Sequence, residues 1–154
     1  MLPPSSIPLT LLTGFLGSGK TTLLNRILHD PALAGCAVLI NEVGEVGLDH
    51  LLVERPDEDV VLLESGCLCC SVRGDLMRAL RELLQRIESG QLTRLDRVVV
   101  ETTGLADPAP VIHTLMHNFE LARHFRLDGV ITTLDPLHAA WQTAQYPEAQ
   151  RQLV

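Results

Sequence analysis

Aromatic residues and long apolar runs are both scarce in this sequence. Phe, Trp and Tyr make up 3% of the 154 residues, although hydrophobic residues as a whole make up 46%. Leu, Val, Ile and Ala must therefore build the core, which is typical of an α/β domain with aliphatic strands between two layers of helices. No apolar run approaches the roughly 20 residues that a membrane helix needs, so we expect no membrane-spanning segment and no membrane partner.

Positive charge is also in short supply. The chain has 12 Lys and Arg residues against 19 Asp and Glu residues, which gives a formal net charge of −7. A nucleic-acid-binding protein draws much of its affinity from neutralising phosphates, so this balance argues against nucleic acid as a partner. Lys20 is the only lysine, and arginines supply the other positive charges. The single lysine therefore calls for an explanation of its own.

The N-terminus lacks the basic residues that precede the apolar stretch of a signal peptide, and Pro3, Pro4 and Pro8 interrupt it. We therefore expect a cytoplasmic protein in a reducing compartment. There, closely spaced cysteines more often serve metal or redox chemistry than structural disulfides. Three of the four cysteines fall within residues 67–70.

Strand-like and helix-like patterns alternate along the chain. Short aliphatic runs predict strands, and apolar residues at helical spacing predict helices. The expected strands cover residues 8–13, 37–40, 60–63, 97–100 and 129–134, and the expected helices cover 21–29, 72–87 and 108–118. Asp107 is expected as the N-cap of the last helix, with Pro108 at its first position. This order predicts a mainly parallel sheet flanked by helices, with the loops after the strands at one edge, where ligands bind in such sheets.

The loop after the first expected strand has the pattern of a phosphate-binding loop. Residues 14–21 read GFLGSGKT and match G-x-x-x-x-G-K-[ST] without a mismatch. Glycines let backbone N–H groups surround phosphates, and the N-terminus of the following helix adds positive charge. Lys20 would neutralise the β- and γ-phosphates, and Thr21 would offer its hydroxyl to Mg²⁺. The pattern predicts a P-loop NTPase fold whose nucleotide contacts are Gly14, Gly17, Ser18, Gly19, Lys20, Thr21 and Thr22.

A carboxylate that could serve Mg²⁺ follows the fourth expected strand. Glu101 ends the run Val98–Val100 and would reach the ion through water. Gly104 could offer its backbone N–H to the γ-phosphate and so distinguish triphosphate from diphosphate. We assign Lys20, Glu101 and Gly104 to the catalytic site. A solvated glutamate at a strand end is the alternative for Glu101.

The cysteines form a compact second site, because residues 66–70 read GCLCC. Cys67, Cys69 and Cys70 can converge on one thiophilic cation such as zinc, at Zn–S distances of ~2.3 Å. Three thiolates leave a fourth position open to water, to a distant carboxylate or to a ligand from a client protein, and Glu42 and Glu45 after the second strand are the natural carboxylate candidates. Buried inert cysteines and redox chemistry are the alternatives. The fourth cysteine stands alone at position 36, before a strand, and is expected in the core.

Five segments together resemble the CobW-type metallochaperone GTPases, a branch of the P-loop GTPases: TLLTGFLGSGKTTLLNRIL, INEVGEVGLD, ESGCLCC, VVVETTGLADPAPV and LDGVITTLD. The resemblance covers essentially the whole chain, and the Cys-x-Cys-Cys loop beside a Walker A motif is its most specific element. It implies hydrolysis of GTP with Mg²⁺, coupled to transfer of Zn²⁺ or Co²⁺ to a client metalloprotein. Residues 14–21 would then contact the nucleotide, Glu101 would serve Mg²⁺, and Cys67, Cys69 and Cys70 would hold the transferred metal.

The chain departs from that family at its C-terminal side. Such GTPases read guanine with an Asn-Lys-x-Asp type motif on a later strand and continue into a smaller C-terminal domain. No lysine follows Lys20, so we expect residues 1–154 to be the N-terminal portion of a GTPase domain that stops before the guanine-recognition strand. The choice of guanine therefore depends on the resemblance alone. A non-catalytic zinc-binding or redox-sensing P-loop module is the alternative function.

Overall fold

The computed structural model describes residues 6–41, 61–65 and 72–153, and the statements below refer to these ranges. Its β-strands are β1 (Ile7–Gly14), β2 (Cys36–Asn41), β3 (Val61–Ser65), β4 (Arg97–Thr102) and β5 (Phe125–Thr133). Its α-helices are α1 (Lys20–Leu28), α2 (Val72–Glu88), α3 (Ala109–His117), α4 (Ala139–Gln145) and α5 (Pro147–Arg151). Short 3-10 turns occur at η1 (Pro31–Leu33) and η3 (Leu121–Arg123).

The strands form one five-stranded sheet in the order β3-β2-β4-β1-β5, and every pair in it is parallel. The predicted α/β fold with a parallel sheet is therefore confirmed. The register aligns the carboxyl ends of neighbouring strands, because Leu12 and Ile40 both lie opposite Glu101, and Asn41 lies opposite both Ser65 and Thr102. The loops that follow these strands consequently start from one edge of the sheet.

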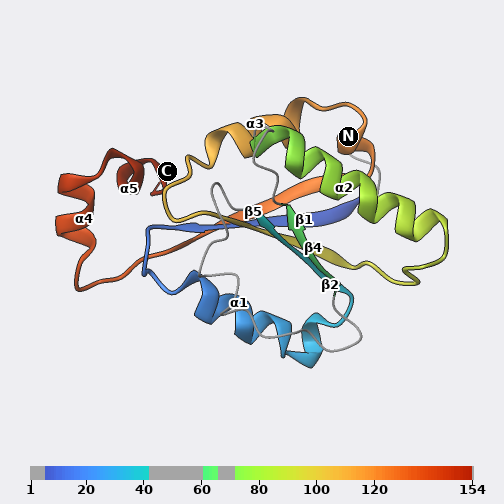
Figure 1. The fold of residues 1–154 in the computed structure, drawn as a ribbon, viewed down its shortest axis with the longest axis horizontal. Helices are drawn as coiled ribbons and strands as arrows, with labels where there is room; N and C mark the ends of the chain where they lie inside the picture. The colour runs from blue at the N-terminus through green and yellow to red at the C-terminus, as the bar shows by residue number, and fades with distance from the viewer. Residues whose placement is uncertain (1–5, 42–60, 66–71, 154) are drawn as a thin grey trace.

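Helices cover both faces of this sheet, with α1 on one side and α2 and α3 on the other (Figure 1). Alternation along the strands explains the two layers, because Leu9 and Leu11 of β1 pack with α2 and α3, whereas Leu12 packs with α1. The sequence alternates in the same way in β4, where Val98 and Val100 join one cluster and Val99 the other. Each buried aliphatic side chain contributes about 1.5–3 kcal/mol, so the core does not depend on aromatic residues.

The predicted burial of Cys36 is confirmed, and the predicted cap of α3 is confirmed in its hydrogen bond but not in its position. Cys36 is buried at 3% exposure in the cluster beneath α1. The carboxylate of Asp107 accepts a hydrogen bond from the backbone N–H of Ala109 at 2.9 Å, as an N-cap side chain does. The N-cap position is occupied by Pro108, whose carbonyl accepts a hydrogen bond from the N–H of Ile112 at 3.1 Å, so Asp107 and Pro108 each lie one position earlier than predicted.

The start of β5 was predicted wrongly. The strand begins at Phe125, four residues before the expected position 129. Arg126 and Asp128 conceal the alternation there, and the pairing with β1 is irregular, since Leu9 lies opposite Leu127 and Thr10 opposite Gly129. An extra residue at this point is a β-bulge, which interrupts the alternation that strand prediction relies on.

The helices α4 and α5 were not predicted. Helix α4 buries none of its residues, and α5 buries only Ala149, so neither has an apolar stripe that the sequence could reveal. Both lie at the end of the sheet toward which β1 runs (Figure 1). Among the described residues, no helix combines the length and the apolar character needed to cross a membrane.

Candidate functional site

The loop between β1 and α1 depends on its glycines for its shape. Gly14, Gly17 and Gly19 have φ angles of 142°, 74° and 95°, which side chains rarely tolerate. At Gly14 there is also no room, because an added Cβ would lie 2.2 Å from Oγ1 of Thr133 and 2.7 Å from Oγ of Ser18. The glycine pattern is thus required by the backbone of this loop, which runs directly into the N-terminus of α1.

Lys20 is the first residue of α1 and is only 8% exposed. Its ammonium group donates hydrogen bonds to the carbonyl oxygens of Gly14 at 2.8 Å and Phe15 at 3.3 Å. A buried ammonium needs such partners, and they hold the charge inside the loop at the positive end of a helix. The arrangement produces an anion-binding centre of the kind that phosphates occupy.

Thr133 was missed by the sequence analysis. Its hydroxyl lies 2.6 Å from that of Ser18 and also bonds the carbonyl of Thr13 at 3.2 Å, so the end of β5 is tied to the loop. This contact could have been predicted, because the fifth strand is parallel to the first and therefore ends at the same edge of the sheet. Thr21 is half-buried, and Thr22 is exposed on α1.

Glu101 lies in the central strand β4, opposite Leu12 and Ile40, and is 7% exposed. Its neighbour Thr102 is 1% exposed and donates its hydroxyl to the carbonyl of Leu12 at 3.4 Å. The carboxylate of Glu101, in the strand beside β1, and the hydroxyl of Thr21, in the first turn of α1, are hard oxygen ligands. Such a donor set fits Mg²⁺ rather than a thiophilic metal.

Gly104 lies in a tight turn that packs directly on the P-loop. The turn is closed by a 3.1 Å hydrogen bond from the N–H of Ala106 to the carbonyl of Thr103. A Cβ added to Gly104 would lie 2.8 Å from the backbone nitrogen of Leu16 and 2.9 Å from its Cα. The structure therefore brings together two segments, residues 14–21 and 103–106, that the sequence analysis assigned to one site.

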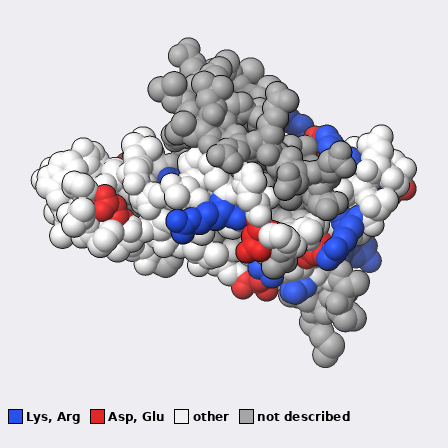
Figure 2. Space-filling model, turned by 90° about the horizontal axis from the view of Figure 1, so that it is seen from below, with Lys and Arg blue, Asp and Glu red and all other residues white. Residues whose placement is uncertain are grey.

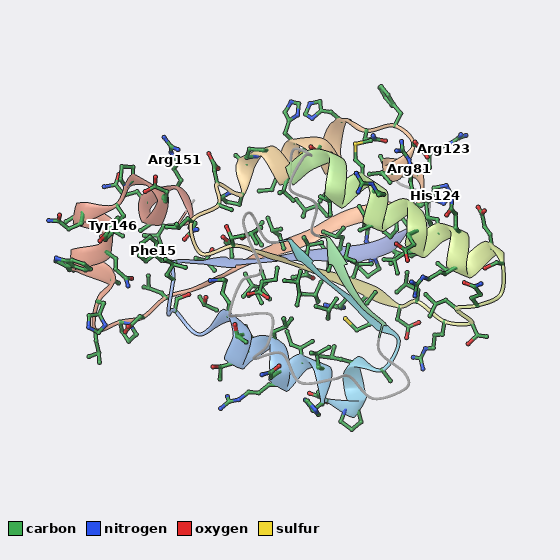
Figure 3. The ribbon with its side chains drawn as sticks, viewed as in Figure 1. Phe15, Arg81, Arg123, His124, Tyr146 and Arg151 are labelled. Atoms are coloured by element: carbon green, nitrogen blue, oxygen red, sulfur yellow. The ribbon has the colours of Figure 1, made fainter. Side chains whose placement is uncertain are left out.

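The C-terminal segment of the described chain also reaches this site, which the sequence analysis did not foresee. Phe15 and Tyr146 lie side by side (Figure 3), with ring centroids 5.1 Å apart. Trp141 meets Tyr146 edge-on, with ring centroids 5.6 Å apart. Gln152 donates hydrogen bonds from its amide to the turn that contains Gly104. Three of the five aromatic residues in the sequence lie together here. The scarcity of aromatic residues is the one feature of the sequence that could have suggested this contact.

The surface around this end is apolar. Figure 2 views the α1 side, and over the described part of that face acidic and basic side chains are intermixed, whereas the end that carries α4 is almost uncharged. Several large apolar side chains are exposed there, namely Leu134 at 50%, Leu137 at 87%, Trp141 at 56% and Leu153 at 50%.

The predicted thiophilic site lies outside the described residues, because Cys67, Cys69 and Cys70 fall within 66–71, and Glu42 and Glu45 within 42–60. The described ranges contain no other group of three or more His, Cys, Asp or Glu residues arranged to hold a metal ion.

Residues 8–154 match the family profile described as the CobW/HypB/UreG nucleotide-binding domain. The chain belongs to this family. Within it, the chain is 44% identical over 147 residues to the zinc chaperone YjiA of Escherichia coli, covering 96% of the chain and 46% of YjiA. It is 40% identical to the zinc-regulated GTPase metalloprotein activator 1 of Schizosaccharomyces pombe, covering 84% of the chain and 32% of that protein. The predicted resemblance to CobW-type proteins is confirmed.

A solved structure of the CobW/HypB/UreG family has the same architecture. The crystal structure of Zn(II)-bound YjiA GTPase from Escherichia coli matches with a TM-score of 0.71 and 38% identity, over 96% of this chain and 46% of that one. The 54 kDa signal recognition particle protein of Aeropyrum pernix, solved with GDP, shares the fold at a TM-score of 0.52 and 21% identity. The chain spans about half the length of YjiA, and it spans less than half the length of the other curated relatives compared with it.

Proposed function

We propose that this chain is the nucleotide-binding portion of a GTP-dependent metallochaperone, which hydrolyses GTP and carries zinc to a client metalloprotein. The observation that carries the proposal is the seating of Gly104 against the P-loop that encloses Lys20. This contact supports the proposal that Gly104 senses a triphosphate bound in the P-loop. The relatives support the rest, because they are named zinc chaperones and a zinc-regulated GTPase.

In the proposed reaction the chain's own groups bind and orient the phosphates. Lys20 exchanges its carbonyl partners for the β- and γ-phosphate oxygens, while the backbone N–H groups of residues 14–19 surround the chain of phosphates. Gly104 contacts the γ-phosphate through its backbone. Thr21 and Glu101 would hold Mg²⁺, which when bound neutralises charge on the β- and γ-phosphates.

Zinc is the cargo in this proposal. Cys67, Cys69 and Cys70 would bind it as thiolates, so binding releases protons and weakens at acid pH. Glu42 and Glu45 are the candidates for a fourth ligand. Co²⁺ would occupy the same sulfur site, since thiolates and the tetrahedral geometry suit both ions.

The sheet register supports coupling between the two sites. Asn41 ends β2, Ser65 ends β3 and Thr102 ends β4, and the three lie opposite one another. The chain therefore leaves β2, β3 and β4 at one edge of the sheet, and Glu42 and Cys67 follow β2 and β3 in the sequence. We propose that triphosphate completes the zinc site and that hydrolysis loosens it, with a coupling of ~1–3 kcal/mol, or roughly 5–150-fold in zinc affinity.

The test uses the full-length protein, with zinc affinity measured at saturating non-hydrolysable GTP analogue and at saturating GDP. Zinc should bind more tightly in the analogue state, and linkage requires zinc to favour the analogue by the same factor. Lys20→Ala should abolish Mg²⁺-dependent triphosphate binding, and Cys69→Ser with Cys70→Ser should remove zinc. Equal zinc affinities in the two states would rule out the switch.

Turnover distinguishes this proposal from a non-catalytic zinc-binding or redox-sensing module. Glu101→Gln keeps the shape of the side chain and removes its charge, so hydrolysis and its Mg²⁺ dependence should both fall. Zinc binding in a protein that never hydrolyses GTP would favour the non-catalytic module.

A further inference from the structure

Gln152 is a glutamine at the end of α5 whose side chain is almost completely buried. The residue is 1% exposed, although it lies in a segment whose neighbours Arg151 and Leu153 are exposed. Buried polar side chains are retained where they hydrogen bond. Both bonds of this side chain end on one short turn.

The amide nitrogen of Gln152 donates hydrogen bonds to the carbonyl oxygens of Gly104 and Ala106, each at 3.0 Å. The two carbonyls fix the orientation of the amide, because its oxygen in the same place would repel them. That oxygen is buried without a hydrogen-bond partner among the described residues. A buried acceptor left unpaired is unfavourable, so the position of this side chain is set by its two donated bonds.

The turn at residues 103–106 is therefore held from two sides. On one side, Gly104 packs on the backbone of Leu16 so closely that no Cβ would fit. On the other, Gln152 holds the two carbonyls that flank Leu105. The turn cannot move relative to the P-loop without stretching these buried hydrogen bonds or moving α5 with it.

The segment that carries Gln152 is itself anchored. Its backbone carbonyl accepts a 2.9 Å hydrogen bond from the hydroxyl of Thr132 in β5, and at the start of α5 the ring of Tyr146 contacts that of Phe15 in the P-loop at a tilt of 32°. Figure 3 shows Phe15 and Tyr146 together at the end of the sheet where α4 and α5 lie. The anchor points bracket the phosphate site, so Gln152 is fixed in relation to the loop that holds the nucleotide.

We propose that Gln152 is a positioning residue for triphosphate recognition. It holds the turn in the position from which the backbone N–H of Gly104 contacts a γ-phosphate. This inference builds on the proposed function, because it concerns the preference of the same site for triphosphate over diphosphate. The diphosphate does not reach Gly104, so its affinity is independent of Gln152.

The test compares Gln152→Met, which keeps the length of the side chain and removes both donors, with Gln145→Met on exposed α4. In the full-length protein, affinities for a non-hydrolysable GTP analogue and for GDP are measured by calorimetry, along with kcat and KM for GTP. Gln152→Met should lose about tenfold in its preference for the analogue over GDP, within the usual range of such couplings. Its GDP affinity should stay within about twofold of the parent, and kcat should fall more than KM rises. Gln145→Met should match the parent.

Gln152→Asn provides a second variant in case the apolar substitution prevents folding. It keeps an amide in the pocket but shortens its reach by one methylene, so the analogue preference should fall in the same direction. Equal loss of GDP and analogue affinity, or no change in either variant, would show that Gln152 serves only the fold and would overturn the inference. If the parent protein binds neither nucleotide, the proposed function fails. If the parent binds both nucleotides but the Gln152 variants keep its preference for the analogue, only the inference about Gln152 fails.

Discussion

Gly104 shows how one missing side chain can determine a contact. The Cβ that any other residue would carry meets the backbone nitrogen and Cα of Leu16, and backbone atoms cannot rotate away as a flexible side chain can. Overpacking of this kind typically costs about 1–3 kcal/mol or forces the two segments apart. At this position the displaced segments are the P-loop and the turn proposed to sense triphosphate.

Gly104→Ala should therefore lower the affinity for a GTP analogue at least tenfold and the affinity for GDP less, because the displaced P-loop contacts both nucleotides whereas Gly104 contacts only the γ-phosphate. Gly129→Ala is the matched control, since Gly129 lies in β5 and a Cβ there would have nothing within 4 Å. Calorimetric titration of both nucleotides measures the effect. If both variants retained the parent's selectivity for the analogue, the turn would have no part in triphosphate recognition.

Cys36 predicts a pH dependence of stability. Burial raises the pKa of its thiol from 9.0 to about 11, against smaller opposing effects of the charge of Arg97 and a backbone hydrogen bond from Val99. Below pH 9 the thiol is neutral in both the folded and the unfolded chain. Between pH 9 and about 11 only the unfolded thiol ionises, so the free energy of unfolding falls as pH rises.

Two pH units correspond to about 2–3 kcal/mol of this alkaline loss. Cys36→Ala should remove that part of the decline, leaving a shallower slope above pH 9 and an unchanged slope below it. Urea unfolding of the parent and the variant between pH 7 and 11 measures the difference. Parallel curves throughout the alkaline range would show that this thiol ionises equally in both states.

At the scale of the elements, the start of α3 depends on a single side chain. Asp107 accepts the hydrogen bond from the N–H of Ala109, which otherwise has no partner within the first turn of the helix. Asp107→Ala should lower the free energy of unfolding by about 1 kcal/mol, whereas Asp107→Asn should retain most of it, because asparagine caps equally well. Equal losses in the two variants would assign the effect to charge instead of the cap.

Helix α2 is also linked at the surface to the segment between α3 and η3. Arg81 of α2 donates two hydrogen bonds to the carboxylate of Glu120, at 3.1 and 2.7 Å, just before η3. This pair keeps the pKa of Glu120 below its ordinary value, chiefly through the hydrogen bond from Arg81. Figure 3 shows Arg81, Arg123 and His124 on this same side of the molecule, away from the phosphate site. Such an exposed ion pair contributes little to the stability of the fold.

The elements that sequence analysis predicts well are those whose pattern is local. The aliphatic runs of β1, β2 and β4, the apolar stripe of α2 and the glycines of the P-loop each carry their signal within a few consecutive residues. The fold class follows from them, and so does the meeting of the P-loop with the segment after β4, since parallel strands align their carboxyl ends. The burial of Cys36 and Glu101 follows in the same way.

The missed residues depend on contacts between distant segments. Gln152 contacts a turn 48 positions earlier, and Thr133 contacts Ser18 across 115 positions. Nothing near Gln152 in the sequence distinguishes it from Gln145 or Gln150, which are exposed. Its contacts appear only once the end of the described chain lies against the turn that contains Gly104. The start of β5 was predicted wrongly for the opposite reason, because the local β-bulge interrupts the alternation of an otherwise regular strand.

At the scale of the whole molecule, β5 is the outermost strand of the described sheet and pairs only with β1 there. Its opposite edge therefore presents backbone N–H and C=O groups beside two apolar side chains, Val130 at 37% and Ile131 at 44% exposure. A strand edge of this kind is a template on which a second molecule can add its own strand, and further additions lead to aggregates.

Residues 1–154 produced alone should accordingly self-associate as concentration rises. Ile131→Lys places a charge on the edge strand and should raise the concentration at which light scattering still reports monomers. Leu137→Lys is the control, because Leu137 is 87% exposed but lies after the strand has ended. If both variants suppressed association equally, general surface hydrophobicity would drive it. If only Ile131→Lys did so, intermolecular strand pairing at β5 would be the cause of self-association, and one lysine would be enough to prevent it.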